Sequence, residues 1–100
     1  RLPDIPEYAT NNGHMFYLVC NCLDDRSALI KTLKDHDILS VFHYLSLHSS
    51  QYYREQHDGR ELAACDRFAD CLVRLPMYYE LNNDMVAHIC SIILRLYQKR

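Results

Sequence analysis

Apolar residues near the end of the chain recur with the period of an α-helix. After Asn82, apolar positions return every three or four residues as far as Tyr97, which places them on one helical face. Asn82 is well suited to cap this helix, because its short side chain accepts a hydrogen bond from the free N–H groups of the first turn. The predicted apolar face consists of Met85, Val86, Ile89, Cys90, Ile92, Ile93, Leu96 and Tyr97.

Two earlier stretches carry the same period. The first follows Asp24 and Asp25, either of which is a candidate N-cap, and should end near residues 36–37. The second runs from Glu61 to Leu72. The apolar face of the first helix consists of Ala28, Leu29 and Leu33 with Ile30 at its margin, and that of the second consists of Leu62, Cys65, Phe68, Ala69 and Leu72.

Three segments predict β-strands. Residues 14–21 are aromatic or apolar on both faces, which predicts a strand that is central in its sheet or lies against another domain. Residues 38–44 predict a second strand, and residues 73–76 a short one closed by Pro76. Because a helix joins the first two over short links, we expect two parallel strands with a right-handed crossover.

The predicted fold is of the α+β class: a small three-stranded sheet with about three helices packed mainly on one face. One hundred residues correspond to a single domain. Residues 1–13 predict an extended lead-in that ends in a turn. The predicted loop 45–60 is longer than is usual in a compact domain, which favours a functional role for it.

Composition narrows the class of protein. Hydrophobic residues make up 49% of the chain, charged residues 24%, and the net charge is -2, as in ordinary globular proteins. The absence of a basic or acidic block argues against nucleic acid or a membrane surface as partner. No apolar run approaches the roughly 18 residues of a membrane span. The five cysteines, an odd number with four in apolar patterns, predict reduced, buried thiols in a cytoplasmic protein.

The densest group of hydrogen-bonding side chains lies in segment 41–54. A predicted strand end leads there into a loop with two imidazoles, three phenols and a guanidinium, which is typical of a binding surface on a rigid scaffold. His43 and His48 suggest a metal site only if a third ligand joins them, and no acidic or cysteine ligand has an obvious spacing. An alternative for Tyr52 and Tyr53 is that they cover a hydrophobic edge.

Lysine is scarce in this chain. Lys31 and Lys34 lie on the predicted wet face of a helix, and Lys99 is next to the last residue. None is expected to be desolvated enough to form a Schiff base at neutral pH. If the chain belongs to a lysine-dependent enzyme, that lysine lies elsewhere.

Several spaced motifs together carry a family resemblance: Gly13–Tyr17, Asp25–Ile30, Val41–Tyr44 with Leu47 and His48, and Arg74–Tyr79. They resemble the C-terminal part of the DegT/DnrJ/EryC1/StrS sugar-nucleotide aminotransferases. Within this family, the opening segment 2–14 is most similar to the dTDP-4-amino-4,6-dideoxygalactose transaminases. The family usually reads His-Tyr-x-Pro-Leu-His at residues 43–48, and this chain has Ser46 in place of that proline.

The resemblance implies a parent protein of aminotransferase fold type I. Such enzymes are homodimers that hold pyridoxal 5′-phosphate on a lysine of a large domain. They pass an amino group from glutamate to a keto sugar attached to a nucleotide. The small domain, which this chain resembles, packs on the large domain and forms one wall of the active site, without a catalytic or cofactor-binding residue of its own. The resemblance places His43, Tyr44, His48, Tyr52, Tyr53 and Arg54 on that wall as substrate-binding residues.

The ends of the chain suggest an internal start and a natural domain end, so we expect a fragment or processed piece of a longer protein that is inactive alone. Such a piece would expose an apolar face and self-associate. Two alternatives stay open. One is a free-standing α+β module whose polar loop binds a small ligand or a protein, and the other is a minor metal site at His43 and His48.

Overall fold

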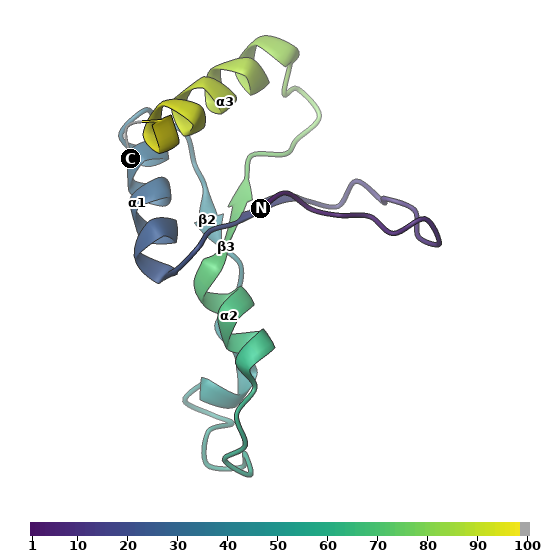
Figure 1. The fold of residues 1–100 in the computed structure, drawn as a ribbon, viewed down its shortest axis with the longest axis vertical. Coiled ribbons are helices and arrows are strands. Elements are labelled where there is room, and N and C mark those ends of the chain that lie inside the picture. The colour runs from purple at the N-terminus through teal and green to yellow at the C-terminus, as the bar shows by residue number, and fades with distance from the viewer. Residues whose placement is uncertain (99–100) are drawn as a thin grey trace.

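The computed structural model describes residues 1–98 as a three-stranded sheet with helices against it (Figure 1). No helix within these residues is both long and apolar enough to cross a bilayer. The strands are β1 (Phe16–Val19), β2 (Val41–Phe42) and β3 (Leu72–Leu75); the helices are α1 (Leu23–Lys34), α2 (Ala63–Cys71), α3 (Asn83–Gln98) and the single 3-10 turn η1 (Leu47–Ser49).

The sheet has β3 in its centre and runs in the order β1-β3-β2. β3 is antiparallel to both neighbours, with Phe16 opposite Leu75 and Phe42 opposite Val73. β1 and β2 therefore run in the same direction, but they are not paired with each other. The predicted parallel orientation of these two strands is confirmed, although the third strand, which follows much later in the chain, inserts between them.

The prediction that strand 14–21 could be central is wrong, since β1 is an edge strand. The backbone of Arg1 is hydrogen-bonded to the end of this strand. The N-terminal ammonium of Arg1 donates to the carbonyl of Val19 at 2.7 Å, and the Val19 N–H donates to the Arg1 carbonyl at 3.0 Å. The apolar residues on both faces of β1 thus reflect partial cover from several segments rather than a central place in the sheet.

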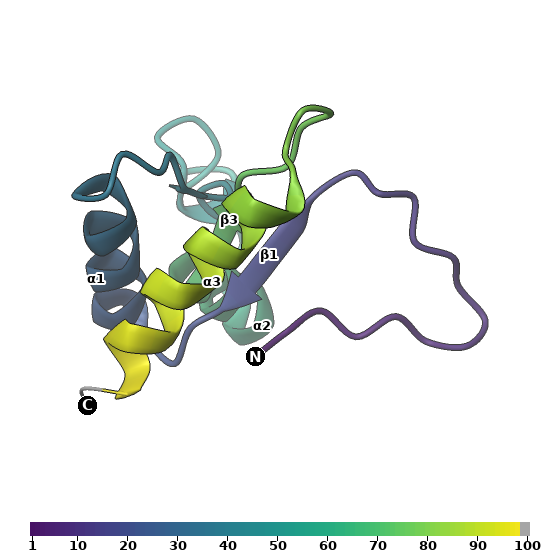
Figure 2. The same ribbon diagram turned by 90° about the horizontal axis from the view of Figure 1, so that it is seen from above.

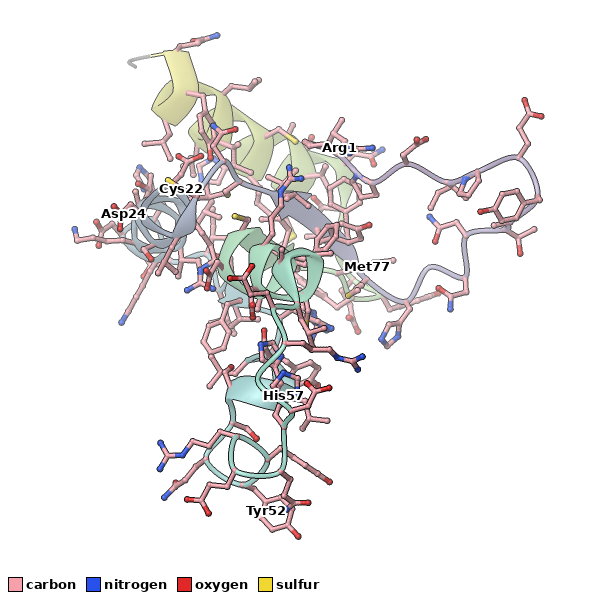
Figure 3. The ribbon with its side chains drawn as sticks, turned by 60° about the horizontal axis from the view of Figure 1, so that its bottom comes forward. Arg1, Cys22, Asp24, Tyr52, His57 and Met77 are labelled. Atoms are coloured by element: carbon pink, nitrogen blue, oxygen red, sulfur yellow. The ribbon has the colours of Figure 1, made fainter. Side chains whose placement is uncertain are left out.

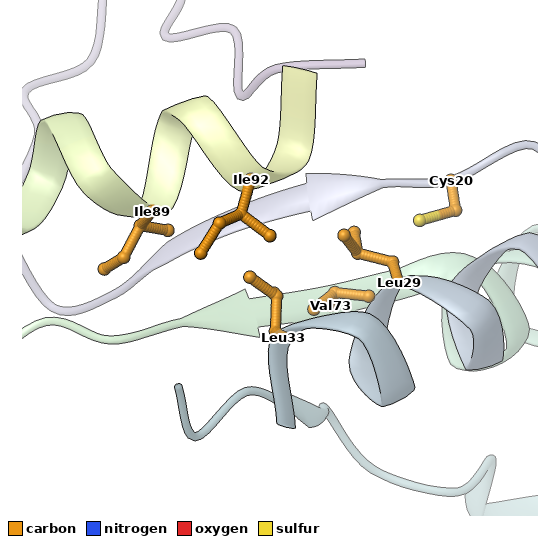
Figure 4. Close-up of a cluster of buried hydrophobic side chains, with 6 residues drawn as sticks. All are labelled: Cys20, Leu29, Leu33, Val73, Ile89 and Ile92. Atoms are coloured by element: carbon orange, nitrogen blue, oxygen red, sulfur yellow. The ribbon is translucent and has the colours of Figure 1, made fainter. Parts of the chain in front are cut away.

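The core lies between the sheet and two helices. α1 and α3 pack on each other and on the same face of the sheet (Figure 2). Leu29, Leu33 and Val73 have no exposed surface, which confirms the predicted apolar face of the first helix. Figure 4 shows this cluster, whose members are Cys20, Leu29, Leu33, Val73, Ile89 and Ile92.

The helix starts differ from one another in how they are capped. The Met85 N–H donates to Asn82 Oδ1 at 2.9 Å, which confirms Asn82 as the cap of α3. The prediction of Asp24 or Asp25 as the cap of α1 is wrong, because Cys22 occupies that position without a side-chain bond. Asp25 instead lies inside the first turn and reaches back, accepting from the Asn21 N–H at 3.2 Å.

Three elements are shorter than predicted. β1 covers Phe16–Val19 instead of residues 14–21. β2 has two residues instead of the predicted 38–44, because only Val41 and Phe42 find partners on the short β3. α2 begins at Ala63 rather than at Glu61. The chain between them leaves the sheet and folds back on the start of α2, and Figure 1 shows it projecting from one end of the molecule, in teal.

The cysteines are all free thiols, in two different environments. Cys20 and Cys71 are buried, whereas Cys22, Cys65 and Cys90 are exposed. The prediction that the cysteines in apolar patterns are buried is therefore wrong for Cys65 and Cys90. Both lie at the margin of an amphipathic helical face that the other elements of this chain do not cover.

Candidate functional site

The candidate site is the polar loop, which we define as residues 43–62 between β2 and α2. Its backbone turns through η1 and then through a run of turns at residues 51–56 before it reaches α2. In Figure 3, Tyr52 lies at the tip of this loop and His57 lies nearer to α2. The loop thus presents its side chains from a projecting segment and not from the sheet itself.

One carboxylate in α2 ties the start of the loop to the helix. Asp66 Oδ1 accepts a hydrogen bond from Ser46 Oγ at 2.9 Å and lies 3.0 Å from His48 Nε2. The Cys65 thiol donates to Ser46 Oγ at 3.6 Å. Ser46 is buried, so its hydroxyl needs these partners to offset the cost of leaving water.

A second imidazole faces the first. The ring centroids of His48 and His57 are 5.1 Å apart, and His57 Nε2 lies 2.9 Å from the Arg60 carbonyl. Because a carbonyl only accepts, His57 carries its hydrogen on Nε2 in this contact. A cavity of about 280 Å³ opens beside the two rings, lined by Leu47, His48, Tyr53, Gln56, His57, Leu62 and Cys65.

The entrance of the loop forms a second, more apolar hollow of about 220 Å³. His43 and Tyr44 meet there edge to face, with ring centroids 4.5 Å apart. His43 Nδ1 is buried without a hydrogen-bond partner among residues 1–98. An orphaned ring nitrogen of this kind fits a place where a further group, from a ligand or a neighbouring domain, completes the contact. Leu47 and Cys65 line both hollows.

The six predicted substrate residues fall into three groups. His43 and Tyr44 line the entrance hollow, while His48 and Tyr53 line the larger cavity. Tyr52 packs edge to face on Tyr53 at 4.8 Å and is otherwise exposed.

Arg54 is exposed and lines neither hollow. The Arg54 N–H donates to the Ser50 carbonyl at 3.0 Å, so the backbone contact belongs to the turn rather than to a site. Of the predicted set, Arg54 is the residue that the structure does not bring together with the others.

Sequence analysis missed Asp66 and His57, which organise the loop. Asp66 is an acidic residue within the predicted helix 61–72, but it lies 20 residues from its partner Ser46. No local spacing rule connects residues that far apart. The adjacent pair Asp58-Gly59 marked a turn, and His57 directly before it was the available signal for a second imidazole in the same loop.

The two groups with clearly perturbed pKa values lie away from the polar loop. Cys20 Sγ and the Tyr97 hydroxyl are 3.7 Å apart beside Asp25. Burial raises the pKa of the Cys20 thiol, and burial followed by the contact with Cys20 raises the pKa of Tyr97. These groups sit between α1 and α3, where a protonated thiol and phenol are packing elements of the core.

Neither described lysine fits the role of a cofactor-binding lysine. The Lys31 side chain is 78% exposed and forms an ion pair with Asp35 at 3.1 Å. Lys34 is exposed on the same helix, and Lys99 lies outside the described residues. Also within residues 1–98, no three His, Cys, Asp or Glu side chains are placed to hold a metal ion.

The fold is that of a domain found in aminotransferases. It matches the structure of PseC from Helicobacter pylori, an aminotransferase involved in the biosynthesis of pseudoaminic acid, with a TM-score of 0.76 over 87% of this chain. The sequence identity of 19% makes this a likeness of fold alone, and the chain spans 24% of the length of PseC. The family model of the DegT/DnrJ/EryC1/StrS aminotransferases matches residues 2–94, and the chain belongs to this family.

Proposed function

We propose that this chain is the C-terminal small domain of a longer, homodimeric aminotransferase. The parent protein uses pyridoxal 5′-phosphate to move an amino group from glutamate to a keto sugar carried on a nucleotide. The chain contributes one wall of the active site, and it is inactive by itself. The observation that carries the proposal is the family match over nearly the whole chain, combined with a span of 24% of the related structure.

The surface of the chain supports a docking role. Large apolar side chains are exposed on the loop and on the outer strands, where a free-standing domain would favour polar groups. In the proposed parent protein, the large domain covers part of this surface. The exposed apolar residues of the strands and the polar loop are Phe16, Val41, Phe42, Tyr44, Leu45, Leu47, Tyr52 and Tyr53.

The lysine environments support a cofactor held elsewhere. A Schiff-base lysine must lose its proton near neutral pH, which requires desolvation or a neighbouring cation. Lys31 has neither, since it is exposed and paired with a carboxylate. The proposed parent therefore binds the cofactor in its large domain.

The polar loop supports a sugar-nucleotide ligand. The cavity between His48 and His57 combines imidazole, phenol and amide groups with an apolar floor, a mixture that suits a sugar ring with several hydroxyl groups. Tyr52 lies at the tip of the same loop (Figure 3), and the exposed Arg54 follows it closely in sequence, where a guanidinium suits a diphosphate. PseC, which shares the fold, acts in a biosynthetic pathway, and this supports an anabolic role.

The test compares the full reading frame with the chain alone. Both are assayed for transfer of labelled nitrogen from glutamate to a dTDP-linked 4-keto-6-deoxyhexose. The full protein should transfer nitrogen, and the chain alone should neither transfer it nor form a borohydride-trappable adduct with pyridoxal phosphate. Tyr53→Phe in the full protein should lower kcat/KM about three- to tenfold, the effect of one hydrogen bond.

Tyr8→Phe is the matched control, because Tyr8 is 92% exposed far from the polar loop. Transfer by the chain alone would overturn the proposal. So would a reading frame that encodes no upstream domain with a cofactor lysine, which would favour the free-standing binding module instead.

A further inference from the structure

We propose that Asp66 is a positioning residue that orients His48, so that Nδ1 of His48 accepts a hydrogen bond from a hydroxyl group of the ligand. Ser46 is the second anchor on the same carboxylate oxygen. The inference rests on the proposed function for the identity of the ligand, whereas the arrangement of the three side chains stands on the geometry alone.

The first step is the direction of the hydrogen bonds. His48 Nε2 lies 3.0 Å from Asp66 Oδ1. Because an ionised carboxylate only accepts, the proposed contact requires the imidazole hydrogen on Nε2. The Ser46 hydroxyl donates to the same oxygen at 2.9 Å and accepts from the Cys65 thiol. The Ser46 hydroxyl and the His48 ring thus meet at one oxygen of Asp66.

The second step concerns the other ring nitrogen. With Nε2 engaged, the neutral imidazole of His48 has Nδ1 as its only acceptor. Within residues 1–98, the polar contact recorded for the His48 ring is that of Nε2 with Asp66, and Nδ1 is the nitrogen that the proposal assigns to the ligand. The side chain of His48 is 16% exposed and lines the cavity of about 280 Å³ beside Tyr53. A ligand hydroxyl in that cavity is a donor of the right kind.

The third step concerns the role of Ser46 at the entrance of the polar loop. Ser46 has φ −59° and ψ 130°, which lies within the range that proline imposes. The backbone therefore follows the path of the proline usual in this family without its ring. The Ser46 carbonyl also accepts from the Ser49 N–H at 3.1 Å and from the Ser49 hydroxyl at 2.9 Å. Ser46 holds the loop entrance by hydrogen bonds where proline would hold it by a fixed torsion.

The geometry is tested by proton and nitrogen NMR on the isotopically labelled chain. An imidazole N–H that is held in a hydrogen bond exchanges slowly enough to be seen. The His48 Nε2–H signal should be present in the wild type, absent in Asp66→Ala, and retained in Ser46→Pro, which keeps the loop path. Asp66→Asn should retain a weaker signal, since its amide oxygen still accepts.

Asp70→Ala is the matched control, an exposed carboxylate on the same helix. Amide spectra of each variant separate a local change from unfolding. A His48 signal that persists in Asp66→Ala, or one that is lost equally in Asp70→Ala, would overturn the positioning role.

The ligand is tested by titration with dTDP-glucose as the probe. Asp66→Ala should weaken binding about tenfold, the loss of one well-placed hydrogen bond, and Asp66→Asn should recover part of that loss. A full wild-type protein that binds no dTDP-glucose, while the Nε2–H pattern of the chain stays intact, would refute the ligand and with it the proposed function of the loop. Equal binding by wild type and Asp66→Ala would refute the positioning role and leave the proposed function standing.

Discussion

The two halves of this molecule are stabilised in different ways. The core region, made of α1, α3 and the sheet, is fixed by apolar side chains that lose their contact with water, among them Leu29, Leu33 and Val73. The polar loop has no comparable cluster, and its entrance is held by the hydrogen bond from Ser46 to Asp66 and by the contact of His48 with the same carboxylate. A buried apolar contact is non-directional and spread over many atoms, whereas each hydrogen bond of the loop depends on two particular atoms.

The difference indicates that substitutions in the polar loop should cost the domain less stability than substitutions in the core region. Removing a core side chain costs stability in the whole domain, since the surrounding atoms relax only partly. A change in the polar loop should alter the position of a few side chains while the domain stays folded. Substitutions in the two regions should therefore differ in their effect on the free energy of unfolding.

The largest effect is expected in the core region. Leu33→Ala should lower the free energy of unfolding by about 2–5 kcal/mol, because Leu33 is fully buried and its removal leaves a cavity. Urea denaturation followed by circular dichroism measures this change. Leu39→Ala is the control, since Leu39 is 80% exposed and its loss should cost less than about 0.5 kcal/mol. Similar losses for both variants would remove the basis of the comparison.

A single polar contact at the edge of the core region should have an intermediate effect. Asn82→Ala removes the cap of α3 and should cost about 1 kcal/mol, because the Met85 N–H loses its partner. Asn82→Asp keeps an oxygen at the same place and should recover most of the loss. Thermal unfolding of the three proteins gives the comparison, and an unchanged midpoint for Asn82→Ala would show that the cap is dispensable.

Two variants of one loop residue should differ in a smaller but informative way. Ser46→Ala loses the donor to Asp66 and should cost about 0.5–1.5 kcal/mol. Ser46→Pro loses the same donor but also restricts the unfolded chain, which is worth about 0.4–1 kcal/mol at a compatible φ. Ser46→Pro should therefore be the more stable of the two in urea. The reverse order would mean that loss of the backbone N–H of residue 46 costs more than the fixed φ of proline contributes.

The thiols offer a comparison without any mutation. Burial raises the pKa of Cys20, so its reactive thiolate is scarcer than usual at neutral pH, and iodoacetamide should modify Cys22, Cys65 and Cys90 first. A raised folded-state pKa stabilises the fold below pH 9, the unfolded value, and this contribution is lost as pH rises above it. Mass spectrometry of partly labelled protein gives the order. Early labelling of Cys20 would show that the core region opens.

The sequence predicted the elements whose apolar residues recur with a regular local spacing. The stripe that contains Leu29 and Leu33 corresponds to a buried face, since a helix brings residues three and four apart to one side. The predicted face of α3 is confirmed only in part, because Ile89 and Ile92 are buried whereas Met85, Val86, Cys90 and Tyr97 are exposed. The order of the strands was not predictable in this way. The residues of a strand indicate how much of its surface is covered, but not which strands pair with it. The central place of β3 depends on pairing with segments far away in the chain.

Only those parts of the candidate site that are close together in sequence could be predicted. His48 and Tyr53 stand close together in sequence, and they share a cavity. Asp66 joins Ser46 and His48 only because α2 folds back beside the loop entrance, a tertiary contact without a local pattern. Ser46 stood out against the family motif, but its hydrogen bond became apparent only in three dimensions.

The central place of β3 has a consequence for the order of folding. β1 and β2 each pair only with β3, and residue 16 meets residue 75. While the chain is being synthesised, neither early strand has a neighbour until residues 72–75 have left the ribosome. Helix α1 can form early by itself, but the sheet closes in a single late step that joins distant segments, and contacts of this kind slow folding. Until that step, β1 and β2 of the nascent chain are unpaired, and α1 has no sheet to pack against.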